Sequence, residues 1–143
     1  MLKKVILYLW QLPQHIIGLF ILKLLNKDVC ITDRSYSKNV YFVKYGVFEC
    51  GISLGEYVIL DKKYFSKNYV YITEQTIKHE IGHSKQSLYF GWLYLLVIGI
   101  PSMFNNIWDR LFHKKWEYEK RVKWYYSRYP EKWADKLGEV NRL

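Results

Sequence analysis

Residues 79–83 of this 143-residue chain read His79-Glu80-Ile81-Gly82-His83. Two histidines four positions apart on an α-helix project from nearly the same face, so both imidazoles can ligate one metal ion. The glutamate between them lies at the flank of that face, where it can take a proton from a metal-bound water and later return it to a leaving group. The pattern therefore predicts a helix that carries a hydrolytic zinc site.

The residues around this stretch favour a helix. Thr73 can cap a helix that starts near Glu74 and continues through Gln86. Gly82 costs about 1 kcal/mol relative to alanine in a plain surface helix, so its presence favours a second backbone packed closely against it. The alternative is a solvated amphipathic helix whose two histidines bind nothing.

A catalytic zinc ion keeps three protein ligands and one open position, so a third ligand is expected. Glu131 is the best candidate, because Pro130 is well suited to start a helix on which Glu131 and Asp135 share one face. Asp135 can then accept the outer N–H of a ligand histidine and orient its ring. The alternative is an ordinary acidic first turn, favoured by the helix dipole. Weaker candidates for the third ligand are Glu117, Glu119 and Glu139.

The two motifs together resemble those of a known family. An HExxH helix followed by Glu-x-x-Ala-Asp is similar to the pattern of the gluzincin metallopeptidases, above all the membrane-associated branch with the CAAX-prenyl endopeptidase and bacterial heat-shock peptidases. The resemblance implies that His79, His83 and Glu131 bind Zn²⁺, that Glu80 is the catalytic base and that Asp135 orients a ligand. This chain is much smaller than those enzymes and lacks their full set of spanning helices.

Length and composition suit one domain over residues 1–143 with a modest core. Aromatic residues make up 19% of the chain, with 14 Tyr and 6 Trp, which is typical of a surface between apolar and wet surroundings. Cys30 and Cys50 could pair between neighbouring strands, but two reduced thiols in a cytoplasmic setting fit better.

The net charge of +9 indicates an anionic partner, either nucleic acid or a membrane surface. The segment 116–126 mixes basic and aromatic residues and suits both. No known nucleic-acid module is present, and two long apolar segments favour the membrane.

The first apolar segment lies within residues 1–25. No formal charge occurs from Val5 to Leu22, and Pro13 between two glutamines predicts a break into two half-helices. We expect an apolar N-terminal anchor or an interfacial helix.

The second apolar segment, residues 87–108, has the hydropathy of a spanning helix. A single crossing would place His83 and Glu131 on opposite sides of a bilayer, although both should bind one ion. We therefore expect a re-entrant or interfacial apolar hairpin that turns back at residues 99–101, where Gly-Ile-Pro supplies a break.

Between these segments the residues favour strands. Val29–Thr32, Val40–Val43 and Tyr57–Leu60 are rich in β-branched and aromatic residues. The predicted fold is α+β: a small sheet, the zincin-like HExxH helix, the apolar hairpin and C-terminal helices, associated with a membrane. Residues 53–60 are the candidate edge strand for binding substrate, with a plain sheet strand as the alternative.

These observations predict a zinc-dependent peptidase at a membrane surface, acting on a protein or peptide. We expect a bacterial-type inner membrane with the site on the cytoplasmic side. The alternatives are a non-catalytic metal-dependent module that binds membrane or nucleic acid, and a DNA-associated HExxH protease. Candidate donors to the reaction's oxyanion are His113, Tyr125, Tyr126 and Arg128.

Overall fold

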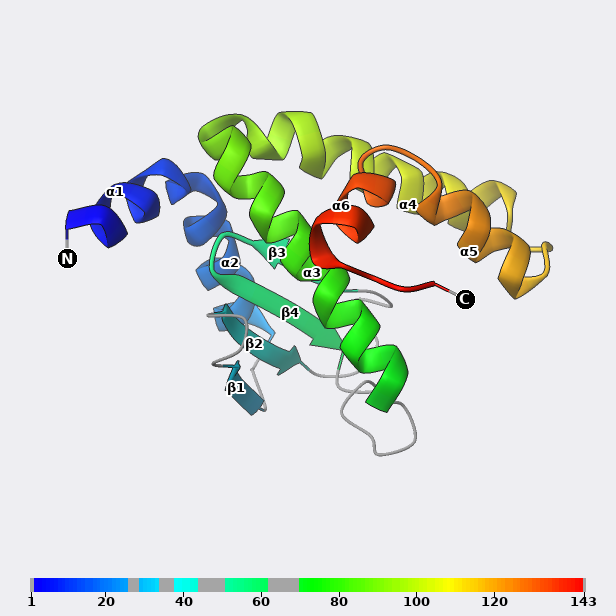
Figure 1. Cartoon of the computed structure of the whole chain (residues 1–143), viewed down its shortest axis with the longest axis horizontal. Helices are drawn as coiled ribbons and strands as arrows, with labels where there is room; N and C mark the ends of the chain where they lie inside the picture. Colours follow the sequence, from blue (N-terminus) through cyan, green and yellow to red (C-terminus); the bar gives the residue numbers. More distant parts are fainter. Residues whose placement is uncertain (1, 26–28, 34–37, 44–50, 62–69, 143) are drawn as a thin grey trace.

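Figure 1 shows a mostly helical protein with one small sheet, which agrees with the predicted α+β class. The computed structural model describes residues 2–25, 29–33, 38–43, 51–61 and 70–142. Its helices are α1 (Leu2–Trp10), α2 (Leu12–Leu24), α3 (Val70–Phe90), the 3₁₀ turn η3 (Gly91–Leu93), the π-helical η4 (Leu95–Gly99), α4 (Ile100–Phe112), α5 (Tyr118–Tyr126) and α6 (Glu131–Gly138). Its strands are β1 (Val29–Asp33), β2 (Lys38–Val43), β3 (Ile52–Leu54) and β4 (Tyr57–Asp61).

The described strands form a four-stranded sheet in the order β1-β2-β4-β3. β2 and β4 are parallel, while the outer strands β1 and β3 pair with them antiparallel. The three strands expected from the sequence are confirmed, but the single strand expected over residues 53–60 is wrong. The chain turns at Gly55 and Glu56, because Gly55 adopts a left-handed φ of 63° that a tight turn needs. Of the two strands that share this segment, β3 lies at an edge of the sheet and β4 lies inside it.

The sheet is packed between two helices. Val58 and Leu60 point to one face and pack with Ile77 of α3. Ile59 points to the other face and packs with Leu22 of α2. This alternation along β4 follows from the two-residue period of a strand, and it places α3 directly on the sheet.

The N-terminal segment is broken as the sequence predicts. α1 and α2 meet at Gln11 with a bend of 78°, and Pro13 lies in the first turn of α2, where its missing N–H leaves no helical bond unmade. Among the described helices, none is by itself both long and apolar enough to cross a bilayer; α1 and α2 reach that length and apolarity only as a bent pair.

Two expectations about α3 and the apolar segment after it need correction. α3 begins at Val70 rather than near Glu74, and it extends to Phe90. The segment does not turn back at residues 99–101: Gly99 has a helical φ of −60°, and η4 leads directly into α4, where Pro101 is accommodated in the first turn. The chain turns instead at Gly91, whose φ of 51° suits glycine.

α3 and α6 pack with their backbones in contact. A Cβ atom added at Gly82 would overlap the carbonyl oxygen of Ala134, and one added at Gly138 would overlap that of Lys78. The close packing expected at Gly82 is thereby confirmed. Because these contacts are four residues apart on each helix, they fix both the separation and the register of α3 and α6.

Candidate metal centre

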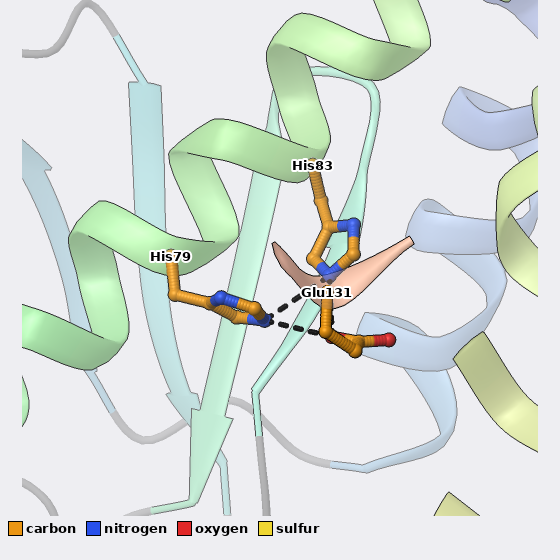
Figure 2. Close-up of side chains that lie close together, drawn as sticks. All are labelled: His79, His83 and Glu131. Atoms are coloured by element: carbon orange, nitrogen blue, oxygen red, sulfur yellow. Dashed lines mark hydrogen bonds and ion pairs between the residues drawn. The ribbon is translucent and has the colours of Figure 1, made fainter. Parts of the chain in front are cut away.

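Three side chains converge where α6 crosses α3 (Figure 2). His79 and His83 come from α3, and Glu131 comes from the first turn of α6. Their facing atoms form a small triangle: His79 Nε2 is 3.0 Å and His83 Nε2 is 3.2 Å from Glu131 Oε2, and the two nitrogens are 3.1 Å apart. All three residues are buried, and within the described part of the chain they form the one cluster of this kind.

The triangle has the size of a metal site. Tetrahedral coordination with bonds of about 2.0–2.1 Å places neighbouring ligand atoms about 3.3 Å apart. The observed separations of 3.0–3.2 Å are close to this value. The second oxygen of Glu131, Oε1, is buried and has no hydrogen-bond partner among the described residues, so it is available to a metal ion or its bound water. These residues can therefore hold a metal ion and leave its fourth position open.

A chain of polar contacts orients His79. Its Nδ1 donates to Asp135 Oδ1 at 2.6 Å, which directs Nε2 toward Glu131. Asp135 in turn accepts two hydrogen bonds from Arg142, of 2.6 and 2.8 Å, and this guanidinium lies 3.2 Å from the centre of the Tyr126 ring. The Tyr126 ring in turn contacts the His79 ring edge-on, with ring centres 5.1 Å apart, so the series of contacts returns to His79.

A second chain orients His83. Gln86 Nε2 donates to the carbonyl oxygen of Pro130 at 3.1 Å, which turns the amide so that Oε1 faces His83 Nδ1 at 2.7 Å. With a metal ion bound, His83 would therefore carry its proton on Nδ1 and present the lone pair of Nε2 to the metal ion. The contact with Asp135 orients His79 in the same way, with its Nε2 toward the triangle. Two nitrogen lone pairs and a carboxylate would then face one another, and a bound cation would offset their repulsion.

The electrostatics of the metal-free site agree with this need for positive charge. Burial alone would lower the pKa of His79, but hydrogen bonds to Asp135 and Glu131 raise it to about 9. Burial would raise the pKa of Glu131, but hydrogen bonds from His79 and His83 outweigh it and hold the pKa well below the usual range. Without a metal ion, a proton occupies the position that a cation would take.

Glu80 lies beside the triangle and lines the same cleft. Its side chain is buried, and burial raises the pKa of its carboxyl, although His79 and His83 partly oppose this. The backbone just before β3 passes close by, because a Cβ atom added at Gly51 would lie 2.5 Å from Glu80 Oε1. A carboxylate with a raised pKa is suited to accept and return a proton near neutral pH.

The triangle opens into a cleft of about 660 Å³. One wall is the edge strand β3 with Ile52 and Leu54, and the other walls come from α2, η4, α4 and α5. Tyr94 is buried in this cleft and donates from its hydroxyl to the carbonyl oxygen of Ser53 at 3.1 Å. The lining is mostly apolar, and besides the triangle and Glu80 its polar groups include Ser102, Asn106 and Arg110 of α4.

The structure places the sequence-predicted residues as follows. The two histidines, Glu80, Glu131 and Asp135 come together in one site. Of the expected oxyanion donors, Tyr125 and Tyr126 line the cleft, whereas His113 packs between two tryptophans and Arg128 lies over Trp124. The rival glutamates are exposed and outside the triangle: Glu117, Glu119 and Glu139. Cys50 and the side chain of Cys30 lie outside the described residues.

Sequence reasoning missed Gln86, Tyr94 and Arg142. Gln86 could have been found, because it lies three residues after His83 on the same helical face. Tyr94 and Arg142 reach the site only through the turn at Gly91 and the path of the chain after α6, which no local pattern indicates.

Comparison of the chain with protein-family models, with curated proteins and with solved structures finds no match.

Proposed function

We propose that this protein is a zinc-dependent peptidase of the gluzincin type. The observation that supports it best is the buried triangle of His79, His83 and Glu131 with the Glu80 carboxylate beside it in an open cleft. A non-catalytic metal site would need the three ligands but not a buried carboxylate with a raised pKa next to them.

Zn²⁺ bound by these residues would supply a Lewis acid and lower the pKa of a bound water toward about 7. The chain itself moves the protons: Glu80 accepts one from the attacking water and delivers it to the departing amine. Asp135 and Gln86 keep the two histidine rings in place during these steps. Tyr126 is the proposed donor to the developing oxyanion, because it lines the cleft and contacts His79, and burial raises the pKa of its hydroxyl so that it keeps its proton.

An extended peptide suits the cleft. β3 is one of the two edge strands of the described sheet and lines the cleft beside the triangle. A substrate strand added to this edge would make main-chain hydrogen bonds to β3 and bring a peptide bond toward Glu80. The apolar walls favour substrates with apolar side chains on either side of that bond.

The test uses Glu80→Gln in the full chain. The variant keeps the size of the side chain but cannot accept a proton, so we expect zinc content to stay at one ion per chain while cleavage of a quenched peptide library falls at least about a hundredfold. Zinc is measured by plasma emission spectrometry and cleavage by fluorescence. Equal cleavage by parent and variant would contradict the role of Glu80.

A matched pair tests the third ligand. Glu131→Ala should lose the zinc ion, whereas Glu139→Ala, an exposed residue eight positions later, should keep it. If the parent binds zinc through Glu131 and cleaves no member of the library, a non-catalytic metal-dependent module becomes the better account.

A further inference from the structure

The N-terminal helix pair buries its polar residues and exposes its apolar ones. Gln11, Gln14 and His15 are at most 2% exposed, although they interrupt an otherwise apolar segment. Ile16 and Phe20, by contrast, are 58% and 61% exposed. His15 donates through Nδ1 to the carbonyl oxygen of Tyr8 and accepts from the backbone N–H of Glu56, so this pair is held firmly against the sheet hairpin. The arrangement is the reverse of that in a helix that faces water.

α4 shows the same reversal. Asp109 is buried and accepts hydrogen bonds of 3.1 and 2.6 Å from Arg121, so its charge is neutralised within the protein. Phe104 and Leu111 on the same helix are 57% and 69% exposed. Burying a paired charge while exposing large apolar side chains is the pattern expected of a helix in contact with hydrocarbon.

Two exposed tryptophans also have their polar atoms satisfied internally. The indole of Trp10 donates to the carbonyl oxygen of Leu88 at 2.9 Å, and that of Trp92 donates to the carbonyl oxygen of Leu9 at 2.8 Å. These bonds join α1 to the end of α3 and to the turn that follows it. They leave neither N–H in need of water, as required of an indole that faces lipid.

We call these exposed apolar side chains the apolar face. Leu9 and Trp10 of α1 line one hollow together with Leu88 and Trp92, and Ile17 of α2 lines the cleft together with Ile100 and Met103 of α4, so the two groups of side chains adjoin each other. In Figure 1, α1 and the helical run into α4 lie along the upper side of the molecule, and β1, β2 and β4 lie below. The members of the apolar face from α1 and α2 are Leu2, Val5, Ile6, Leu9, Trp10, Ile16, Ile17, Leu19, Phe20 and Leu24. Those from the end of α3 through α4 are Leu88, Trp92, Leu93, Leu96, Ile100, Met103, Phe104, Ile107, Trp108, Leu111 and Phe112.

The charges bordering the apolar face in α1 and α2 are cationic. Lys3, Lys4 and Lys23 are exposed at the ends of this helix pair, where no acidic residue occurs. Beyond the end of α4, Lys114 and Lys115 are exposed as well. Lysines around an apolar surface complement the anionic headgroups of a phospholipid layer.

We propose that the apolar face is immersed in the surface of an anionic phospholipid bilayer, with α1, α2 and α4 in contact with lipid. The cleft of the candidate metal centre opens on the same face, because Ile17, Ile100 and Met103 line the cleft and are also exposed. A bound bilayer therefore lies at the mouth of the cleft.

The test measures binding of the full chain to vesicles of phosphatidylcholine with and without 30% phosphatidylglycerol, about a third of the lipid being enough to make the surface anionic. The variants are Phe20→Glu and Leu111→Glu on the apolar face. The matched control is Tyr118→Glu on α5, a residue 75% exposed and outside the apolar face. All three variants change the net charge equally, so a difference between them reports contact with hydrocarbon.

We expect Phe20→Glu and Leu111→Glu to lower the partition coefficient more than about tenfold in both kinds of vesicle, and Tyr118→Glu to leave it within about twofold. Lys3→Gln with Lys4→Gln should lower only the preference for phosphatidylglycerol, by about fivefold for each lysine. Zinc content of each variant shows that the fold and the metal centre are intact, and it does not depend on vesicle binding.

Two results would overturn the proposal. In the first, the variants on the apolar face bind vesicles as the parent does. In the second, the parent does not bind vesicles and is a dimer by light scattering, while Phe20→Glu and Leu111→Glu are monomers. That result would show that a second copy of the chain covers the apolar face. Neither result bears on peptide cleavage, so the proposed peptidase activity is tested separately.

Discussion

Each histidine of the candidate metal centre depends on a polar neighbour that lies outside the HExxH stretch. His79 is held by Asp135 and His83 by Gln86, so both rings present Nε2 to Glu131. The two orienting groups differ in charge. Asp135 is an ionised acceptor whose pKa is held below its usual range: burial opposes this, but hydrogen bonds with His79 and Arg142 outweigh it. Gln86 is neutral.

Arg142 is therefore predicted to be a positioning residue for the metal. Arg142→Met should lower zinc affinity about tenfold, because Asp135 loses both of its hydrogen bonds from the guanidinium. Arg142→Lys should keep part of the zinc affinity that Arg142→Met loses, since an ammonium can pair with one carboxylate oxygen of Asp135 at a time. Affinity is measured by competition with a chromophoric chelator. The control is Arg128→Met, which removes a cation stacked on Trp124.

The role of Arg142 can be separated from a general effect on folding. In an Asp135→Asn background, Arg142→Met should have almost no further effect on zinc affinity, because the two residues act through one contact. A full additional loss in that background would contradict the assignment.

The metal affinity should rise with pH. The metal-free protein holds a proton on His79, whose pKa is raised to about 9, and a metal ion has to displace it. We expect zinc affinity to increase about tenfold per pH unit from pH 6.5 and to level off near pH 9. Chelator competition across this range measures it. In Asp135→Asn the plateau should move to lower pH, and an unchanged profile there would contradict this account.

The same pKa predicts the stability of the metal-free protein. A folded-state pKa above the unfolded value of 6.5 stabilises the fold below pH 6.5, and this contribution is lost as the pH rises through about 9. The stabilisation that a bound metal ion provides should instead increase as the pH rises, because the metal ion competes with the proton on His79.

At the scale of elements, the contact between α3 and α6 decides whether a site exists at all. Glu131 and Asp135 reach the two histidines only because the helices touch at Gly82 and Gly138. Further contacts support this pairing: Lys85 donates to the carbonyl oxygen of Leu137 at 2.6 Å, and Trp133 stacks on Tyr89.

Gly82→Ala and Gly138→Ala should both be destabilising, by about 1–3 kcal/mol in the free energy of unfolding, because the added methyl group meets backbone atoms that cannot move aside cheaply. Zinc affinity should fall as well, since α6 is displaced. Urea unfolding and chelator competition measure the two effects. Gly99→Ala is the control: its added Cβ would have neighbours at 3.7 Å and beyond, so we expect a neutral or stabilising change of up to about 1 kcal/mol. Equal effects at all three glycines would contradict the packing argument.

For the whole molecule, the candidate metal centre joins segments that are distant along the chain. The triangle links residues 79 and 83 to residue 131, and the cleft adds walls from α2 and β3. A ligand that bridges such segments binds the folded chain far better than the unfolded one, and so it stabilises the fold.

Zinc is accordingly expected to raise the melting temperature in a concentration-dependent way. At free zinc about a thousand times the Kd, the stabilisation should be about 4 kcal/mol. Thermal unfolding followed by circular dichroism, with zinc or with a chelator, measures it. Glu131→Ala should show almost no shift, and an equal shift in that variant would mean that zinc binds elsewhere.

Much of the fold and of the candidate site could be predicted from residues that are close in sequence. The HExxH spacing indicates two ligands on one face of a helix, and the Glu131–Asp135 spacing indicates a second such helix. Strand composition located β1, β2 and β4, and Pro13 marked the break before α2. These are local preferences, so the sequence alone determined them.

Only the tertiary structure decided where the chain turns and what meets at the site. The turn at Gly91 rather than at residues 99–101, and the hairpin at Gly55, depend on packing against Trp10 and His15, which lie far away along the chain. Tyr94 and β3 reach the cleft, and Arg142 reaches Asp135, through the same long-range packing. Local sequence determines the conformation of a segment and the side chains that it offers, whereas burial and backbone contact between distant segments determine which of them meet.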